Sequence, residues 1–369
     1  MNRLWETFSA LTAIDSPSLG ERALCDALKA RLLDMGVSVY EDDAGAQIGG
    51  NCGNLYGFLA GSLSLPPLLL SSHMDTIEPG RGKKAVIDAR GVITSSGDTV
   101  LGADDAAGIT VILESLARLR ETGAPHRPVE LLFPVAEESY GLGSVIADYG
   151  RIRAKESYTL DLSGAIGEAA DTAPTLLSFE ITVTGKAAHA GFAAKHGVSA
   201  IAAAAKAISR MPLGEPEPGV TVNVGRIAGG EASNSVPALC RVFGEIRSLS
   251  HNMALEHLKR VLDVFTEECA AAGASAAASH RCEITVYATP PDSPVVRRFV
   301  RACERIGVAP NIHSTMGGSD QNNFALHGIQ GLVIACSMHD GHSTREYCRL
   351  DEMEQCVELV MAMLTDGTA

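Results

Sequence analysis

Five residues of the kinds that bind metal ions lie far apart along the chain, each in a short and distinctive stretch of sequence. They are His73 in SSHMDT, Asp104 in GADDAAG, Glu138 in AEES, Asp161 in LDLSG and His342 in GHSTRE. Two imidazoles and three carboxylates form a set that suits zinc, or cobalt and manganese, when one carboxylate bridges two ions. A fold that uses all five must bring early and late parts of the chain together.

A further carboxylate, Glu137, stands directly beside Glu138. Adjacent acids can divide two tasks, proton transfer and metal binding, and metal-assisted hydrolysis requires both. Each fragment alone is weak, because a lone His-x-Asp is more often a hydrogen-bonded strand end than a ligand pair. Their combination indicates a dinuclear metal hydrolase.

Composition narrows the class of protein. With 369 residues, 46% of them hydrophobic, the chain is long enough for two domains with sizeable cores. Its formal net charge of −14 argues against a nucleic-acid partner, which would require clustered Lys and Arg. The one basic run, Arg81 to Lys84, is expected to be a solvated loop.

The cysteines and the N-terminal sequence favour a cytoplasmic location. Nine cysteines are dispersed without a C-x-x-C pair, and an odd number cannot pair completely within the chain. The first residues lack the pattern of a signal peptide. The longest apolar runs, such as PPLLL before His73, are far shorter than the roughly 20 residues of a membrane span, so no membrane partner is expected.

Alternating patterns predict an α/β fold on both sides of an insertion. Helices are expected over 20–35, 106–122, 293–307 and 350–364, and strands over 37–40, 54–59, 68–71, 129–135 and 331–335. Most candidate ligands then fall at or just beyond strand ends. Open α/β sheets hold their sites there, outside the carboxyl ends of the strands.

The inserted stretch has the order β-α-β-β-α-β, which is the ferredoxin-like arrangement of helices on an antiparallel sheet. Its strands are expected over 178–185, 221–230, 239–248 and 282–289, and its helices over 199–210 and 253–272. We therefore expect one discontinuous domain formed by residues 1–176 and 290–369, and an inserted α+β domain at 177–289.

Motifs along nearly the whole chain resemble the M20 metallopeptidases, most closely the peptidase T-like branch of aminotripeptidases. They are HMDT, LGADDAAG, EES followed by GLGS, LDLSG, GKAAHAG, NVGRIAGGEASNSVP, GEIRS, GGSDQNNF and GHSTREY. The resemblance implies a zinc-peptidase-like catalytic domain with a mixed sheet, interrupted by a ferredoxin-like lid that also serves dimerisation. It also implies two divalent metal ions, with Zn²⁺ expected and Co²⁺ or Mn²⁺ as alternatives.

The resemblance assigns a role to each metal-type residue. His73 and Asp161 would bind one ion, Glu138 and His342 the other, and Asp104 would bridge them. His339 competes with His342, but the family pattern of His, then Ser or Thr, then Glu four positions on matches His342, Ser343 and Glu346.

Spacing alone does not decide whether Asp104 or Asp105 is the bridging residue. The family pattern Ala-Asp-x-Lys favours the first, although this chain has Ala106 where many relatives have Lys. In the family the peptide bond after the bridging Asp is cis. The resemblance therefore implies a cis bond between Asp104 and Asp105.

Two more residues would complete the catalytic set. Asp75 would hold the imidazole of His73 in orientation, since alternation along an extended segment puts both side chains on one face. Glu137 would be the general base that takes a proton from the attacking water and delivers it to the leaving amine.

The inserted domain would supply contacts to the substrate. His189 resembles a lid histidine that stabilises the oxyanion, often from the partner subunit in dimeric relatives. Asn234 and Arg247 would contact the substrate, and guanidinium suits a peptide carboxylate. A surface ion pair is the alternative for Arg247. Gly317 and its neighbour Gly318 would let the backbone approach the site.

The resemblance favours a peptidase that releases the N-terminal residue from short peptides, with a homodimer through the lid domain. One alternative keeps the site and changes the substrate, as in M20-type acylases and carboxypeptidases. Another is a non-catalytic peptide-binding relative. Serine-hydrolase and P-loop chemistry are not expected, because neither G-x-S-x-G nor G-x-x-x-x-G-K-[ST] occurs.

Overall fold

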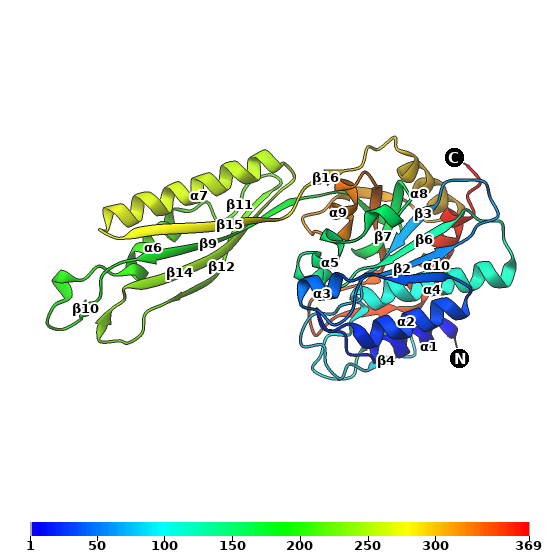
Figure 1. Ribbon diagram of the computed structural model, residues 1–369, viewed down its shortest axis with the longest axis horizontal. Coiled ribbons are helices and arrows are strands. Elements are labelled where there is room, and N and C mark those ends of the chain that lie inside the picture. Colours follow the sequence, from blue (N-terminus) through cyan, green and yellow to red (C-terminus); the bar gives the residue numbers. More distant parts are fainter. Residues whose placement is uncertain (1, 369) are drawn as a thin grey trace. The chain divides into compact units, whose positions relative to one another are not determined.

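The computed structural model describes residues 2–368 and separates the chain into two compact units (Figure 1). The first unit runs to Thr172 and resumes over Ala288–Thr315 and from Ser319 onward. The second unit comprises Ala173–Tyr287 together with Met316–Gly318. These last three residues were expected in the discontinuous domain. They contact the second unit through Arg247, whose Nη1 donates a 2.9 Å hydrogen bond to the carbonyl of Met316.

Within residues 2–368 the first unit holds a nine-stranded mixed sheet. In spatial order its strands are β1 (Ser38–Glu41), β2 (Leu55–Leu59), β6 (Val129–Phe133), β3 (Leu68–Ser71), β7 (Glu156–Ser163), β18 (Gln330–Met338), β8 (Glu168–Ala173) and β16 (Tyr287–Ala288), with β17 (Asn311–Ser314) pairing with β8. The four central strands β6, β3, β7 and β18 run parallel to one another. Their carboxyl ends therefore meet at one edge of the sheet.

Helices cover the sheet on both faces. The largest core cluster joins the sheet to α1 (Arg3–Thr12), α2 (Arg22–Asp34), α4 (Ala103–Thr122), α8 (Pro294–Arg305) and α10 (Leu350–Leu364). A smaller cluster packs α9 (Asp320–Leu326) against the sheet through Phe324 and Leu69. Figure 1 shows α4 and α10 lying together on one side of the sheet and α9 on the other.

Short elements complete the first unit around the strand ends. They are α3 (Ala44–Ile48), the 3₁₀ turns η1 (Glu137–Ser139) and η2 (Tyr149–Arg151), α5 (Leu142–Val145), and a small sheet of β4 (Ala85–Ile87), β5 (Val92–Ser95) and β19 (Tyr347–Arg349). The expected helices and strands of this unit are confirmed, with ends shifted by a few residues. Strand β7 (Glu156–Ser163), which carries Asp161, was not predicted, and neither were the short strands β4, β5, β8, β17 and β19, none of which carries a long apolar run.

The second unit is an antiparallel sheet with two helices packed on it. Its strand order is β11 (Gly214–Glu217), β12 (Val220–Gly229), β14 (Leu239–Ser248), β9 (Thr175–Thr184) and β15 (Ser275–Ile284). Both α6 (Ala200–Arg210) and α7 (His251–Ala271) pack on this sheet through a shared apolar core, and Figure 1 shows α7 running along it. A two-stranded pair of β10 (Ala188–His189) and β13 (Ser235–Val236), and the turn η3 (Ala194–His196), lie outside it. The fold is thus a mixed-sheet α/β unit interrupted by an α+β unit, as predicted.

The last strand of the second unit was predicted at the wrong place. It was expected over 282–289, but β15 spans Ser275–Ile284 and only the short β16 follows. The reason is that β15 is an edge strand with mostly exposed Ala, Ser and charged side chains. Such a strand lacks the apolar alternation that marks a half-buried strand.

No helix within residues 2–368 is long and apolar enough to cross a membrane. All nine cysteines lie in this described range and are free thiols, and of these only Cys282 is exposed.

Helix α4 approaches the sheet very closely at Gly108. A Cβ atom added there would lie 2.5 Å from the carbonyl oxygen of Leu160 on β7 and 2.5 Å from Asp105 Oδ1. The backbone N–H of Gly108 also donates to Asp105 Oδ1 at 3.1 Å. The close packing of the start of α4, which carries Asp104 and Asp105, therefore requires that residue 108 has no side chain.

We predict that Gly108→Ala lowers the free energy of unfolding by about 1–2 kcal/mol. Helix propensity favours Ala over Gly by about 1 kcal/mol, but overpacking a core costs roughly 1–3 kcal/mol, and backbone atoms on β7 cannot move aside cheaply. Urea unfolding measures the difference. Gly97→Ala is the control, because a Cβ there meets nothing within 4 Å; equal effects at the two positions would contradict the prediction.

Candidate active site

Three of the five candidate ligands come from neighbouring parallel strands. His73 lies two residues beyond β3, Glu138 lies in η1 just beyond β6, and Asp161 is near the carboxyl end of β7. Because β6, β3 and β7 are adjacent, these side chains are delivered to one place. His342 follows β18, the next strand in the sheet, and Asp104 lies at the start of α4.

Asp104 contacts both histidines. Its Oδ1 lies 2.9 Å from His73 Nε2, and its Oδ2 lies 3.3 Å from His342 Nε2. His342 Nε2 is also 3.0 Å from Glu138 Oε2. Asp104 therefore stands between two ligand pairs with one oxygen toward each, which is the arrangement expected of a bridging carboxylate.

Two overlapping groups among the described residues could each hold a metal ion. In the first, ligand atoms of His73, Asp104 and Glu138 all lie within 4.8 Å of one another; in the second, the same holds for His73, Glu137 and Asp161. His73 Nε2 is 3.9 Å from Asp161 Oδ1. Both groups contain His73, but Glu138 shares its group with Asp104 and Glu137 shares its group with Asp161.

The two neighbouring aspartates have different surroundings. Asp105 is 1% exposed, and its Oδ2 accepts hydrogen bonds from Ser72 Oγ at 2.5 Å and from the N–H of His73 at 3.2 Å. Its carboxylate is engaged by the core, whereas that of Asp104 faces the histidines. The peptide bond between them is cis, as the resemblance implied. Sequence spacing had left open which aspartate faces the cluster, and the structure places Asp104 there.

Glu346 fixes the backbone around Asp104. Its Oε2 accepts from the N–H of Gly102 at 2.7 Å, and its Oε1 accepts from the N–H of Asp104 at 2.9 Å. The side chain is 2% exposed. In the sequence, Glu346 was only the last member of the family pattern around His342. Its hydrogen bonds show that it holds the backbone on which Asp104 lies.

The prediction that the basic run Arg81 to Lys84 is solvated is wrong for Lys83. This side chain is 4% exposed, and its Nζ donates to the carbonyl of Gly80 at 3.0 Å. Its aliphatic stem passes so close to Gly102 that a Cβ there would lie 2.9 Å from Lys83 Cε. A long cationic side chain can bury its stem while a carbonyl accepts from its head group, and sequence pattern does not reveal this.

Asp75 orders the turn that carries Glu137 and Glu138. Its Oδ1 accepts from the N–H of Glu137 at 2.8 Å, and its Oδ2 accepts from the N–H of Glu138 at 3.1 Å and from Ser18 Oγ at 2.6 Å. His73 Nδ1 lies 3.3 Å from Asp75 Oδ1, close enough for electrostatic attraction but not aligned as a hydrogen bond. Asp75 was expected to orient His73; its clearest contacts are with the next strand end.

Burial and mutual repulsion dominate the electrostatics of the cluster. Burial raises the pKa of Glu137 well above its usual value, and Asp320, Glu138 and Asp75 add to this shift. Burial likewise raises the pKa of Asp161, helped by Glu137 and Asp104. Burial opposes the charge on His73, but Asp104, Asp75 and Asp161 raise its pKa well above normal.

The donor atoms fit divalent cations. Imidazole nitrogen and carboxylate oxygen are the ligands that zinc takes in catalytic sites. Among the described residues Glu138 Oε1 is buried without a hydrogen-bond partner, and such an orphaned acceptor needs a proton or a cation. A positive ion would also relieve the repulsion that raises the carboxylate pKa values.

His339 is engaged elsewhere. Its Nε2 lies 2.6 Å from Glu352 Oε2, and its ring stacks on Tyr347 with centroids 4.7 Å apart. Of the two competing histidines, His342 is the one beside Asp104 and Glu138.

The predicted substrate contacts belong to the second unit. His189 on β10 pairs with Ser235, next to Asn234, whose carbonyl accepts from the N–H of Ala190 at 2.9 Å. Arg247 on β14 binds Glu245 Oε1 at 2.9 Å and the carbonyl of Met316, next to Gly317. The guanidinium of Arg247 therefore has partners within its own unit, and the roles of all four residues stay predictions.

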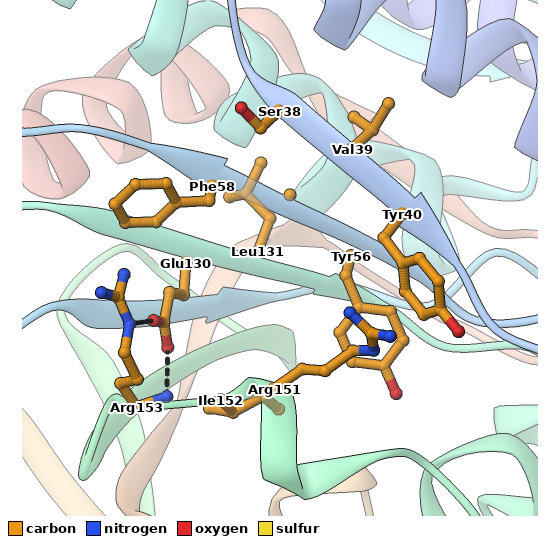
Figure 2. A pocket seen from close by; sticks show the side chains of 11 residues that line it. Ser38, Val39, Tyr40, Tyr56, Phe58, Glu130, Leu131, Arg151, Ile152 and Arg153 are labelled. Atoms are coloured by element: carbon orange, nitrogen blue, oxygen red, sulfur yellow. Dashed lines mark hydrogen bonds and ion pairs between the residues drawn. The ribbon is translucent and has the colours of Figure 1, made fainter.

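A cavity of about 290 Å³ in the first unit is separate from the ligand cluster. Figure 2 shows it on strands β1, β2 and β6, with the guanidinium of Arg151 3.5 Å from the ring centroid of Tyr40 and that of Arg153 4.6 Å from Phe58. Its carboxylate, Glu130, accepts from Arg153 Nε at 2.9 Å. None of the candidate ligands lines this cavity.

Comparisons with known proteins place the chain among peptidases. The peptidase dimerisation domain matches residues 173–273, and peptidase family M28 matches residues 54–203. The aminopeptidase PepT from Bacillus cereus ATCC 10987 is 36% identical, with 99% of this chain and 98% of that chain covered and a TM-score of 0.91. A tripeptidase from Staphylococcus aureus Mu50 is 30% identical over the same shares, with a TM-score of 0.96.

A more distant structure shares the fold alone. It is a protein from Bacillus subtilis described as a dinuclear metal-binding peptidase of the M20 family, which is 15% identical over 98% of this chain and 97% of that chain, with a TM-score of 0.74.

The full-length likeness to two peptidases, together with the carboxylate and imidazole cluster at the strand ends, defines a hydrolase of the peptidase class. The chain belongs to the M20 family of peptidases, in the branch that resembles peptidase T.

In the metal-free protein, His342 should make stability depend on pH. Hydrogen bonding to Asp104 and Glu138 raises the pKa of His342 to about 10. A histidine whose pKa is higher in the folded state stabilises the protein fully below its unfolded value of about 6.5. This contribution is lost as pH rises toward 10. Because the side chain is 60% exposed, solvent screening reduces its size.

We therefore predict that, in excess chelator, His342→Ala lowers the melting temperature most at pH 6 and progressively less toward pH 10. Thermal unfolding at pH 6, 8 and 10 measures this difference. His280→Ala, at an exposed position of edge strand β15, is the control and should shift the melting temperature equally at all three values. A destabilisation by His342→Ala that grows with pH would contradict the assignment.

Proposed function

We propose that the chain is a dinuclear metal-dependent aminopeptidase that releases the N-terminal residue from short peptides. One observation carries the proposal: Glu137 and Glu138 are neighbours in one turn and both group with His73, yet Glu137 groups further with Asp161 while Glu138 groups with Asp104 and contacts His342. Two adjacent carboxylates with separate surroundings can serve as base and ligand in one site.

His73, Asp161, Glu138 and His342 would hold two divalent cations, with Asp104 between them. When bound, the cations supply Lewis acidity and lower the pKa of a water molecule in the site. Mixed nitrogen and oxygen ligands make Zn²⁺ the first choice, with Co²⁺ or Mn²⁺ as alternatives. The Bacillus subtilis structure described as dinuclear shares this fold.

Glu137 would act as the general base. Its carboxylate would accept the proton of the attacking water and return it to the nitrogen of the leaving amine. Burial and neighbouring carboxylates raise its pKa, and a raised pKa makes the return of the proton easier. Beside two divalent cations, the carboxylate of Glu137 would be ionised when the water arrives.

The second unit would select the substrate. We propose that His189 stabilises the oxyanion and that Asn234, Arg247 and Gly317 contact the peptide. The match to the peptidase dimerisation domain supports a homodimer through this unit. The names of the two solved relatives, an aminopeptidase and a tripeptidase, support short peptides as substrates. The nine free thiols fit the proposed cytoplasmic location.

A mixture of substrates tests the proposal. The zinc-loaded protein is incubated with di-, tri- and tetrapeptides and with N-acyl amino acids, and mass spectrometry identifies the products. We predict release of the N-terminal residue from tripeptides in preference to the other peptides, with no cleavage of N-acyl amino acids. Cleavage of acyl substrates alone would instead identify an acylase, and release of C-terminal residues a carboxypeptidase.

A further inference from the structure

The segment between α1 and α2 lies against two of the strand ends that carry the site. Ser16 accepts at its carbonyl from the N–H of Thr76 at 2.9 Å, and Pro17 forms a parallel bridge with Thr76. Ser18 donates to Asp75 at 2.6 Å. Residues 16–21 therefore contact the HMDT stretch after β3 and, through Glu21, the turn after β6.

Glu21 lies directly before α2 but does not cap it. Its side chain makes no capping hydrogen bond to its own helix. Instead Oε1 accepts from the N–H of Leu19 at 2.9 Å and from the N–H of Ala136 at 3.0 Å. Ala136 has a left-handed φ of 52° and immediately precedes Glu137. A carboxylate distant in sequence therefore binds the residue that immediately precedes the turn of Glu137 and Glu138.

Two buried acids together bind three consecutive amides. Glu21 accepts from the N–H of Ala136, and Asp75 accepts from those of Glu137 and Glu138. Hydrogen bonds that N–H groups donate to ionised acceptors are stronger than those to neutral acceptors. The backbone from which the side chains of Glu137 and Glu138 diverge is thus fixed at every N–H.

Keeping an acid at position 21 is costly for stability. The side chain is 0% exposed, and among the described residues Oε2 is buried without a hydrogen-bond partner. Burial and the nearby Asp75 raise the pKa of Glu21 to about 7. No ion pair with a described Lys, Arg or His side chain offsets this cost. A neutral apolar residue at position 21 would destabilise the fold less. We therefore explain the buried carboxylate of Glu21 by the hydrogen bonds that it accepts from backbone amides.

We propose that Glu21 is a positioning residue that acts through the N–H of Ala136 to set the directions of Glu137 and Glu138. The inference rests on the proposed function for its catalytic consequence. The effect of Glu21 on metal binding by Glu138 can be measured whether or not the protein is a peptidase. Metal binding and turnover therefore provide two separate tests.

The experiment compares Glu21→Gln, Glu21→Ala and Cys25→Ala. Gln retains an oxygen that accepts from Ala136, whereas Ala removes it. Cys25 is a buried residue one turn further along α2 and serves as the control for damage to the helix. Circular dichroism and thermal unfolding establish the folded fraction of each variant. Calorimetric titration with cobalt chloride gives metal affinity, and tripeptide hydrolysis gives kcat and KM.

Removing a group that orients metal ligands commonly costs about 10–100-fold in affinity or activity. For Glu21→Ala, corrected for folded fraction, we expect cobalt affinity to fall at least about 10-fold and kcat at least about 10-fold, with KM changed less than about 2-fold. Glu21→Gln should recover both within about 3-fold, and Cys25→Ala should match the wild type.

Equal losses in Glu21→Gln and Glu21→Ala would overturn the proposal, as would losses that vanish on correction for folded fraction. If the wild type cleaves no peptide, the proposed function fails and the cobalt series alone decides. The same 10-fold loss and recovery would support positioning, and unchanged cobalt affinity in Glu21→Ala would refute it.

Discussion

Repulsion among buried carboxylates is the constraint on which the structure of this site depends. Two like charges 4 Å apart repel by about 4 kcal/mol at the effective dielectric of a protein surface. Asp104, Glu137, Glu138 and Asp161 gather around His73, within the distances that a cation would bridge. Three adjacent parallel strands, β6, β3 and β7, deliver most of these groups to one edge of the sheet.

Four further buried acids surround the cluster, and each of these supporting acids accepts hydrogen bonds from donors of its own. Asp105 is bound by Ser72 and the N–H of His73, and Glu346 by two amides at the start of α4. Asp75 and Glu21 bind the amides of the turn after β6. These four are held by the protein, which leaves the carboxylates of the cluster itself to face the histidines. The candidate metal site therefore consists of the carboxylates that face the histidines, while the supporting acids hold the surrounding backbone.

The sequence predicted the part of this arrangement that depends on pattern. Apolar strands ending in HMD and AEES indicated ligands at strand ends, and the β-α-β-β-α-β order indicated the inserted unit. It could not show that Asp104 rather than Asp105 faces the cluster, because adjacent residues differ only in how the turn directs them. It also gave no sign of Glu21, since an acid before a helix is ordinary, or of Lys83, whose burial depends on Gly102. Edge strand β15 was misplaced because its exposed small residues carry no periodic signal.

Metal content and kcat, measured on the same samples of Glu137→Ala and Glu138→Ala, test most directly whether Glu137 and Glu138 perform different tasks. Removing a general base commonly lowers turnover by about 10²–10⁴-fold. We predict that Glu137→Ala keeps the metal content of the wild type while kcat falls at least about 100-fold, and that Glu138→Ala loses metal. Full activity in Glu137→Ala, or metal loss equal to that of Glu138→Ala, would contradict this prediction.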